Sequence, residues 1–437
     1  MNRTKYLIIG NSAGGFGAVE AIRRVDKSGL ITVVSDEPYP AYSRPLISEH
    51  LFENRPIDKM LFRAPDFYEK NNIQTILGTT VEKIDTQANT ANLDDGTLIL
   101  WEKLLLATGG QPIIPQMDGI KANGFFTFTT LNDAIAIDQY LPKVKNVVVI
   151  GGGLIGVSVT DALVKRGVNV TIVEMKDRIL NTLLDEEAGA LVLSKLVEKD
   201  VRVITGRTVT DINSDFTTEI VNGVTLDNGS EISAGMVIIA VGVKPRVELA
   251  VGTGIKVNRG ILVDRTMQTS VPNIYACGDA SEAFDFVYGD NRITPIWPNA
   301  YAGGSIAGFN MAGKKTEYRG GTAMNSIKYF GLSITSAGMV SPPDDSYEVI
   351  SNKNGTNYKK IILKDGFVTG LIFAGNIESS GIIFGLMKDK VNINECKQAT
   401  LADDFSFLSL PEAIWRKRLE DSFIKPVAEA FGGGVRQ

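Results

Sequence analysis

One local pattern occurs twice in this chain, about 140 residues apart, and it constrains the fold more than any other feature. In each copy a short apolar run enters a cluster of glycines, a helical stretch follows, and a second apolar run ends at an acidic residue. This order predicts a βαβ unit with a tight turn between the first strand and the helix. The expected strands are residues 5–10 and 30–34 in the first copy, and 146–150 and 168–173 in the second. The long separation indicates an internal duplication, because solenoid repeats recur every ~20–50 residues.

The glycines of both copies have the spacing of a phosphate-binding turn. Residues 10–15 are GNSAGG, and residues 151–156 are GGGLIG. Such a turn needs glycine for its sharp bend, a small residue where the backbone meets a pyrophosphate, and glycine where helix and strand touch. The phosphates then lie at the positive end of the helix. The first motif alone would also suit a turn without a ligand, but two such turns in one chain favour two dinucleotides.

Acidic residues follow the second strand of each copy. Asp36 and Glu37 end the first copy, and Glu174 ends the second. A carboxylate about 20 residues beyond the glycines binds ribose hydroxyls in dinucleotide folds. At Glu174 it would also repel a 2′-phosphate, which favours NADH over NADPH. Lys176 and Arg178 lie near enough to weaken that preference.

Three further apolar runs end at small residues, before Thr108-Gly109, Val241-Gly242 and Gly278-Asp279. A glycine at a strand end allows the backbone to approach a cofactor closely. Asp279 is placed to accept a hydrogen bond from a ribityl hydroxyl. These strand ends therefore strengthen the prediction of bound cofactors.

Composition excludes several other classes of protein. Of the 437 residues, 44% are hydrophobic and 22% are charged, which predicts a folded chain of several domains. The 45 Lys and Arg against 50 Asp and Glu give a net charge of −5, so we expect neither a nucleic-acid partner nor a membrane surface. The longest uncharged stretch, residues 293–313, is broken by proline and glycine. We therefore expect a cytoplasmic protein.

Cysteine and histidine are too scarce for most metal and thiol chemistry. The chain has two cysteines, Cys277 and Cys396, and one histidine, His50. A disulfide framework and a cysteine-ligated cluster are excluded, and we expect no metal site. Cys277 follows a buried strand, which favours a packed thiol over a reactive one.

Five motifs, taken in order, resemble those of the FAD-dependent pyridine nucleotide oxidoreductases with two dinucleotide-binding domains. They are GNSAGG at 10–15, LLLATGG at 104–110, VVVIGGGLIG at 147–156, IIAVGVKP at 238–245 and NIYACGDA at 273–280. The resemblance covers about residues 4–400 and implies an α/β fold, with two interleaved Rossmann-like domains and a C-terminal α+β domain. The implied boundaries are a split FAD domain (1–118 and 248–322), an NAD(P) domain (119–247) and an interface domain (323–402). Residues 403–437 lie outside the resemblance and are expected to form a helical extension.

The resemblance also implies which residues bind the two cofactors. For FAD they are Gly10, Ser12, Ala13, Gly14, Gly15, Asp36, Glu37, Arg44, Pro45, Ala107, Thr108, Gly109, Gly278, Asp279 and Trp297. For NAD(P)H, with NADH favoured, they are Gly151, Gly153, Leu154, Ile155, Gly156, Glu174, Val241 and Gly242. Ser43, Arg44 and Trp297 are expected near the isoalloxazine.

Departures from the family pattern indicate the branch. Disulfide reductases carry a cysteine in the region that corresponds to residues 41–48, and this chain has none there, so thiolate chemistry is not expected. Ala13 replaces the histidine of NADH peroxidases. Residues 42–46 (YSRPL) resemble the Y-x-R-P-P-L motif of rubredoxin reductases, ferredoxin reductases, the flavin portion of NADH nitrite reductase and apoptosis-inducing factor. Residues 297–300 (WPNA) similarly resemble a W-x-N-A motif of ferredoxin reductases, in which the tryptophan lies by the flavin.

Three positions differ from that branch as well. Glu49 and Ser158 stand where the branch often has a lysine–glutamate pair, and Leu154 replaces an aromatic residue that covers the flavin. Because hydride transfer needs positioning rather than an acid or base, we expect activity not to depend on these positions.

The function expected from these observations is an enzyme without a redox-active disulfide, an FAD-dependent NAD(P)H:acceptor oxidoreductase. It would pass hydride from NADH to flavin, and electrons onward to an external iron–sulfur protein of the rubredoxin or ferredoxin type. Three alternatives remain open. They are a flavin/NAD subunit of a larger iron–sulfur complex that runs toward NAD⁺ reduction, a signalling flavoprotein of the apoptosis-inducing type, and a peroxide-forming NADH oxidase.

The C-terminal part of the chain has different patterns. Residues 324–375 alternate as antiparallel strands do, and Lys364-Asp365-Gly366 predicts a hairpin turn. Residues 409–412 have the spacing of a capping box, and an apolar stripe over 415–431 predicts a helix. We expect this stripe to dock a second protomer of a homodimer or an iron–sulfur partner subunit.

Overall fold

The structure is a computed structural model that describes residues 2–412 and 414–416. Apart from residues 415 and 416, the predicted apolar stripe over 415–431 therefore lies outside the described residues. The chain divides into two compact units. The first comprises residues 1–181 and 193–323, and the second comprises residues 182–192 and 324–437.

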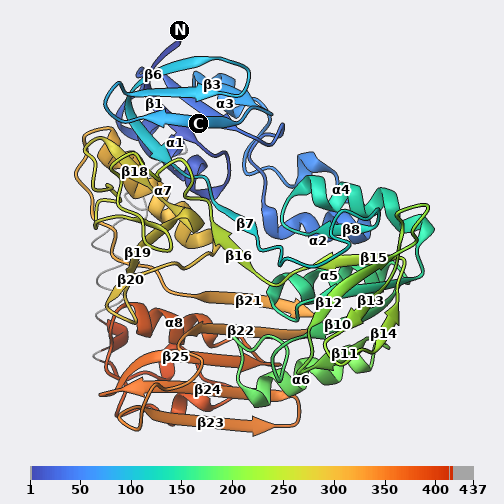
Figure 1. The fold of residues 1–437 in the computed structure, drawn as a ribbon. Helices are drawn as coiled ribbons and strands as arrows, with labels where there is room; N and C mark the ends of the chain where they lie inside the picture. The colour runs from blue at the N-terminus through green and yellow to red at the C-terminus, as the bar shows by residue number, and fades with distance from the viewer. Residues whose placement is uncertain (1, 413, 417–437) are drawn as a thin grey trace. The chain divides into compact units, whose positions relative to one another are not determined.

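The first unit contains a mostly parallel sheet at the N-terminus (Figure 1). Its strand order is β3-β2-β1-β6-β5-β4, and β18 pairs with β6. The bounds are β1 (Asn2–Ile9), β2 (Ile31–Ser35), β3 (Ile73–Leu77), β4 (Val81–Asp85), β5 (Thr90–Leu93), β6 (Leu98–Leu106) and β18 (Ile274–Ala276). Strand β18 thus joins a sheet otherwise built from the first 106 residues, with Ile274 opposite Leu104. Strand β2 is buried along its whole length, as its apolar run predicts.

Helices and short strands complete this part of the first unit. They are α1 (Ala13–Val25), α2 (Ile47–Glu53), α3 (Phe67–Lys70), α7 (Trp297–Met311), β17 (Ile261–Leu262), β19 (Ser281–Asp285) and β20 (Asp290–Arg292), with 3₁₀ turns at Arg44–Leu46, Ile57–Lys59 and Gly278–Ala280.

A second parallel sheet has the order β11-β10-β9-β15-β8. Its strands are β8 (Phe125–Thr127), β9 (Asn146–Ile150), β10 (Asn169–Glu174), β11 (Arg202–Thr205) and β15 (Met236–Ile239). The associated helices are α4 (Leu131–Tyr140) and α5 (Leu154–Lys165), with a 3₁₀ turn at Leu141–Lys143. Helix α6 (Glu186–Val197) lies between β10 and β11 in the chain, and its residues up to 192 belong to the second unit. An antiparallel sheet is formed by β12 (Val209–Ser214), β13 (Val221–Leu226) and β14 (Glu231–Ser233). Strands β7 (Gly110–Pro112) and β16 (Val243–Pro245) pair antiparallel where the chain passes between the two parallel sheets (Figure 1).

The second unit contains a five-stranded antiparallel sheet in the order β21-β22-β25-β24-β23. Its elements are β21 (Met324–Tyr329), β22 (Leu332–Gly338), β23 (Glu348–Asn354), β24 (Asn357–Lys364), β25 (Phe367–Ala374) and α8 (Ser380–Lys388). The predicted hairpin is confirmed, because Lys364 pairs with Phe367 and the two loop residues between them, Asp365 and Gly366, have φ of 51° and 82°. Positive φ at both positions is the geometry of a type I′ turn. The predicted α/β class with a C-terminal α+β part is confirmed as well.

One detail near the C-terminal end of the described residues differs from the sequence prediction. The predicted capping box over residues 409–412 is wrong in position, since Ser406 and Ser409 form the box around the 3₁₀ turn Phe407–Ser409. The Ser409 hydroxyl oxygen accepts from the Ser406 N–H at 3.1 Å, whereas the sequence spacing had paired Ser409 with Glu412.

Among the helices of the described residues, none is both long enough and apolar enough to cross a membrane.

Helices α1 and α7 lie side by side at backbone contact (Figure 1). A Cβ atom built on Gly304 would lie 1.9 Å from the carbonyl oxygen of Gly14, and one built on Gly308 would lie 2.4 Å from that of Ala18. From the other side, a Cβ on Gly17 would lie 2.5 Å from the carbonyl oxygen of Tyr301. Glycine is therefore required at these positions, and the contact fixes the start of α7 close to the first glycine turn.

Gly304→Ala tests this contact. We expect it to reduce the free energy of unfolding by about 2–3 kcal/mol or more, because the new methyl group has only backbone to displace. The matched control is Gly381→Ala in α8, where an added Cβ meets nothing within 4 Å among the described residues. That variant should be neutral or stabilise by about 0.5 kcal/mol. Thermal unfolding of both variants measures the difference, and equal midpoints would contradict the close packing.

Candidate functional site

The first glycine turn requires glycine for steric reasons at three of its positions. Gly10 has φ of +113°, and a Cβ there would lie 2.1 Å from the carbonyl oxygen of Ala107. A Cβ on Gly15 would lie 1.9 Å from the carbonyl oxygen of Gly10. Gly14 faces the Cys277 sulfur, which would be 2.7 Å from an added Cβ. The turn thus brings β1, α1 and the ends of β6 and β18 together.

The second glycine turn repeats this geometry. Gly151 has φ of +105°, and a Cβ there would lie 2.5 Å from the carbonyl oxygen of Ala240. A Cβ on Gly156 would lie 1.9 Å from the carbonyl oxygen of Gly151, the same distance as in the first turn. The duplication predicted from sequence is therefore present at the level of individual backbone contacts.

Both turns lead into helices whose N-termini are suited to an anion. Ser12 is the N-cap of α1 and Gly153 is the N-cap of α5; the Ser12 side chain accepts no capping hydrogen bond from the described residues, and glycine has no side chain to do so. Neither helix has an acidic residue in its first turn. A Cβ atom built on Gly153 would meet no atom of the described residues within 4 Å, its chain neighbours and its own helix aside. First-turn N–H groups and the helix dipole therefore fit a diphosphate at each turn.

The two acidic residues after β2 lie in different environments. Glu37 is buried and accepts hydrogen bonds from the Tyr42 hydroxyl at 2.5 Å and from the Arg44 guanidinium. Burial raises the pKa of Tyr42, so its hydroxyl remains a donor at neutral pH. Asp36 is exposed and forms an ion pair with Arg246 at 2.7 Å. Arg246 was missed from sequence, although it directly follows the IIAVGVKP motif.

Glu174 braces the second glycine turn. Its carboxylate is buried, and its two oxygens accept hydrogen bonds from the Gly152 N–H at 2.6 Å and the Lys176 N–H at 2.8 Å. A carboxylate has further lone pairs, so it can still accept from a ribose hydroxyl.

The predicted strand-end residues meet where the chain passes between the parallel sheets. The Thr108 hydroxyl donates to the Arg246 carbonyl at 2.7 Å, and the Arg246 N–H donates to the Gly109 carbonyl at 2.9 Å. Gly109 and Gly242 have positive φ, +71° and +127°, and Val241 remains 40% exposed. The glycines at these ends are thus required by backbone conformation.

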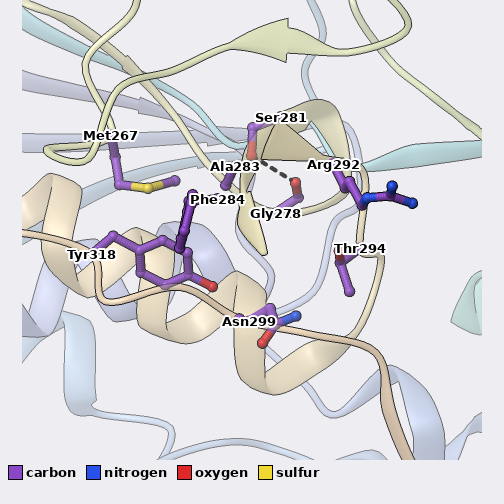
Figure 2. Close-up of a pocket in the computed structure, with 10 residues that line it drawn as sticks. Met267, Gly278, Ser281, Ala283, Phe284, Arg292, Thr294, Asn299 and Tyr318 are labelled. Atoms are coloured by element: carbon purple, nitrogen blue, oxygen red, sulfur yellow. Dashed lines mark hydrogen bonds between the residues drawn. The ribbon is translucent and has the colours of Figure 1, made fainter. Parts of the chain in front are cut away.

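Gly278 and Asp279 begin the 3₁₀ turn after β18, as the sequence indicated. Burial raises the pKa of Asp279, and the positive charge of Arg44 opposes that rise, so these two predicted residues are electrostatically coupled. Figure 2 shows a cavity beside Gly278, where the Ser281 hydroxyl donates to the Gly278 carbonyl at 3.0 Å. The cavity is about 20 Å³, which suits one water molecule and not a dinucleotide.

Trp297 lies in an aromatic cluster at the start of α7. Its ring stacks on Tyr301 with centroids 5.5 Å apart and contacts Phe62 edge-on at 5.3 Å. Ser43 lies close to the segment that contains Phe62, because the Ser43 N–H donates to the carbonyl of Met60. Phe62 was missed from sequence, where no periodicity marks it. The tryptophan remains 36% exposed.

The described residues contain no group of three or more His, Cys, Asp or Glu side chains arranged to hold a metal ion. Both cysteines are free thiols. The His50 ring makes a local hydrogen bond at the end of α2, with Nδ1 2.7 Å from the Arg55 carbonyl oxygen. Glu49, in the position of the missing lysine, forms an ion pair with Arg55 at 2.7 Å.

Comparison with known proteins identifies the family. Residues 4–304 match the family model of the pyridine nucleotide-disulphide oxidoreductases, and residues 324–391 match the rubredoxin NAD⁺ reductase C-terminal domain. The chain therefore belongs to the pyridine nucleotide-disulphide oxidoreductase family. It is an FAD-dependent NAD(P)H oxidoreductase, as the sequence predicted.

Three relatives illustrate the range within the family. The chain is 31% identical to the epsilon subunit of the NADH-dependent phenylglyoxylate dehydrogenase of Aromatoleum evansii, over 92% of this chain and 96% of that one. It is 29% identical to the NAD(P)H nitrite reductase of Bacillus subtilis, over 93% of this chain, but it spans only 50% of that protein. The crystal structure of NADH:rubredoxin oxidoreductase from Clostridium acetobutylicum matches with a TM-score of 0.73 and 27% identity, over 90% of this chain and 97% of that one.

Thiol labelling tests the absence of disulfide chemistry. Burial raises the pKa of Cys277 to about 12, so the thiol is protonated at pH 8 and is a poor nucleophile. We expect iodoacetamide at pH 8 to label Cys396 slowly and to leave Cys277 unmodified in the folded protein, without loss of reduction by NADH. Mass spectrometry locates the label, and labelling in denaturant controls for reagent access. Rapid labelling of Cys277 in the native protein would contradict this assignment.

Proposed function

We propose that this enzyme takes electrons from NADH through bound FAD and delivers them to an iron–sulfur protein of the rubredoxin or ferredoxin type. The observation that carries this proposal is a partly exposed tryptophan, Trp297, that is connected through Tyr301 and Glu20 to a pocket lined by Arg24, Lys27 and Lys70, on a chain whose net charge is −5. The match of residues 324–391 to the rubredoxin reductase C-terminal domain supports it.

We propose the same cofactor residues as the sequence predicted, with added roles for their partners. The N-terminus of α1 would bind the FAD diphosphate, Asp279 would accept from a ribityl hydroxyl, and Arg44 would lie near the flavin. The N-terminus of α5 would bind the NADH diphosphate, and Glu174 the adenosine ribose. When bound, FAD supplies an acceptor for a hydride that can return the electrons singly.

The basic pocket lies over the C-terminal end of α1 and over α3. It has a volume of about 380 Å³, and its lining includes Arg24, Lys27 and Lys70. Glu20, which also lines it, accepts from the Tyr301 hydroxyl, and Tyr301 stacks on Trp297. A partner with an acidic face would therefore be drawn to the exposed edge of this aromatic cluster.

We also propose a cytoplasmic location and a role as a homodimer or complex subunit. The proposed domains are residues 1–118 with 248–322, 119–247, 323–402 and 403–437. The pairing of β18 with β6 supports the split of the first domain.

A second candidate is a flavin subunit within a larger iron–sulfur complex. It is favoured because this chain covers 96% of a relative that is itself described as one subunit of a dehydrogenase. Fast reduction by NADH without reoxidation by free rubredoxin or ferredoxin would favour this candidate. A slow reduction with a long-lived charge-transfer band would favour a signalling flavoprotein, and rapid oxygen uptake an oxidase.

The acceptor proposal is tested by anaerobic stopped-flow reduction with NADH, followed by mixing with rubredoxin or ferredoxin. In Arg24→Glu/Lys27→Glu we expect acceptor reduction to slow about tenfold at low ionic strength, with a smaller effect at high salt. Turnover with ferricyanide, a small acceptor, should change less than twofold. The control Lys199→Glu/Arg202→Glu changes net charge equally at exposed positions elsewhere. Equal slowing in both double variants would refute specific docking.

Glu174→Gln tests the cofactor preference. The substitution removes the negative charge beside the proposed ribose site and keeps the size of the side chain. Its amide nitrogen no longer accepts one of the two backbone N–H groups, so both nucleotides should bind more weakly and the ratio between them is the readout. We expect the preference for NADH over NADPH in kcat/KM to shrink about tenfold, because a 2′-phosphate is no longer repelled. Asp177→Asn is the control, since its side chain is 77% exposed three residues away. An unchanged preference in Glu174→Gln would place the adenosine ribose elsewhere.

A further inference from the structure

Two adjacent lysines of β24 are buried in the second unit, with 2% exposure for Lys359 and 8% for Lys360. Lys360 donates to the Asp185 carboxylate at 3.0 Å and to the Val340 carbonyl at 3.1 Å. The Tyr358 hydroxyl donates to the same Asp185 oxygen at 2.7 Å. Two donors from one strand thus converge on a single carboxylate oxygen.

The other oxygen of Asp185 is also engaged. It accepts from the Ala188 N–H at 3.1 Å in the first turn of α6. Burying a lysine is unfavourable unless its charge is paired, so the contact between Lys360 and Asp185 is specific rather than incidental. The Asp185 carboxylate is therefore held on one oxygen by β24 and on the other by α6, the helix that begins directly after Asp185.

Asp185 lies at the end of the connection that follows β10 and contacts the second glycine turn through Leu180. Residues 182–192 group with the second unit, although β10 before them and β11 after them belong to the sheet of the first unit. Five residues before Asp185, the N–H of Leu180 donates to the Gly152 carbonyl at 2.8 Å. Leu180 is fully buried with φ of +52°. A leucine adopts this conformation only where its surroundings hold it there.

We propose that Lys360 and Tyr358 are positioning residues for NADH. By holding Asp185, they fix the far end of the connection over residues 175–185 and keep Leu180 against Gly152 in the turn that binds the diphosphate. This inference rests on the NADH site proposed above. It gives the C-terminal sheet a part in cofactor binding, in addition to its match to a rubredoxin reductase domain.

Lys359 provides a matched control on the same strand. Its Nζ donates to the Ala402 carbonyl at 2.7 Å and lies 3.2 Å from Asp403, so it holds a different segment. Neighbouring residues of a strand point to opposite faces, which explains the two separate partners. Loss of Lys359 removes a buried, paired lysine without touching residues 182–192.

We expect Lys360→Met to raise the KM for NADH about tenfold, and to raise the Kd of ADP-ribose measured by calorimetry by a similar factor. With ferricyanide as acceptor, kcat should remain within twofold, and FAD content should be unchanged. Tyr358→Phe, which removes only one hydroxyl, should act in the same direction about threefold. Lys359→Met should lower the thermal midpoint without changing either nucleotide constant.

The result that would overturn the proposal is a shared loss of thermal stability in Lys360→Met and Lys359→Met, with both nucleotide constants unchanged. Should Lys360→Met fail to fold, Tyr358→Phe decides. Faster amide exchange over residues 177–188 with weaker ADP-ribose binding supports the proposal, and unchanged exchange and binding refute it. Failure of the wild-type protein to bind ADP-ribose would refute the NADH site itself, which separates the two failures.

Discussion

The close approach of a glycine turn to the end of a neighbouring strand determines much of the first unit. At Gly10 and Ala107, and again at Gly151 and Ala240, backbone meets backbone with no room for a side chain. This contact draws the start of a helix over the carboxyl end of a parallel sheet, where the N–H groups of its first turn converge. The helix terminus can bind an anion because the turn beneath it is this tight.

Much of this arrangement follows from local sequence. Strand length, glycine spacing and the hairpin at Asp365-Gly366 are set by residues that are neighbours in the chain, so their pattern predicted them. The partners of the acidic residues were not predictable in the same way. Arg246 reaches Asp36 across 210 positions, and Phe62 reaches Trp297 across a similar span. Such contacts depend on tertiary packing, which no short-range periodicity encodes.

The two acidic strand ends show how equivalent positions diverge after a duplication. Glu174 binds two backbone N–H groups of its own turn, which are near in sequence. Glu37 instead binds Tyr42 and Arg44, side chains of the segment that departs from the disulfide reductases. In the first copy the carboxylate therefore organises the residues expected near the flavin. In the second it stabilises the turn at which we propose that the NADH ribose binds.

The buried pair of Lys360 and Asp185 suggests why a separate C-terminal unit is useful to an enzyme of this kind. A dinucleotide that must bind and leave in each cycle needs a turn that has one preferred conformation and can still move. A buried ion pair favours one conformation, since breaking the pair leaves an uncompensated charge in a low dielectric. Residues 182–192 carry that constraint along the covalent chain toward Leu180 and Gly152. Changes in the sheet that holds Lys360 would then alter nucleotide affinity without any change in the residues that touch the nucleotide.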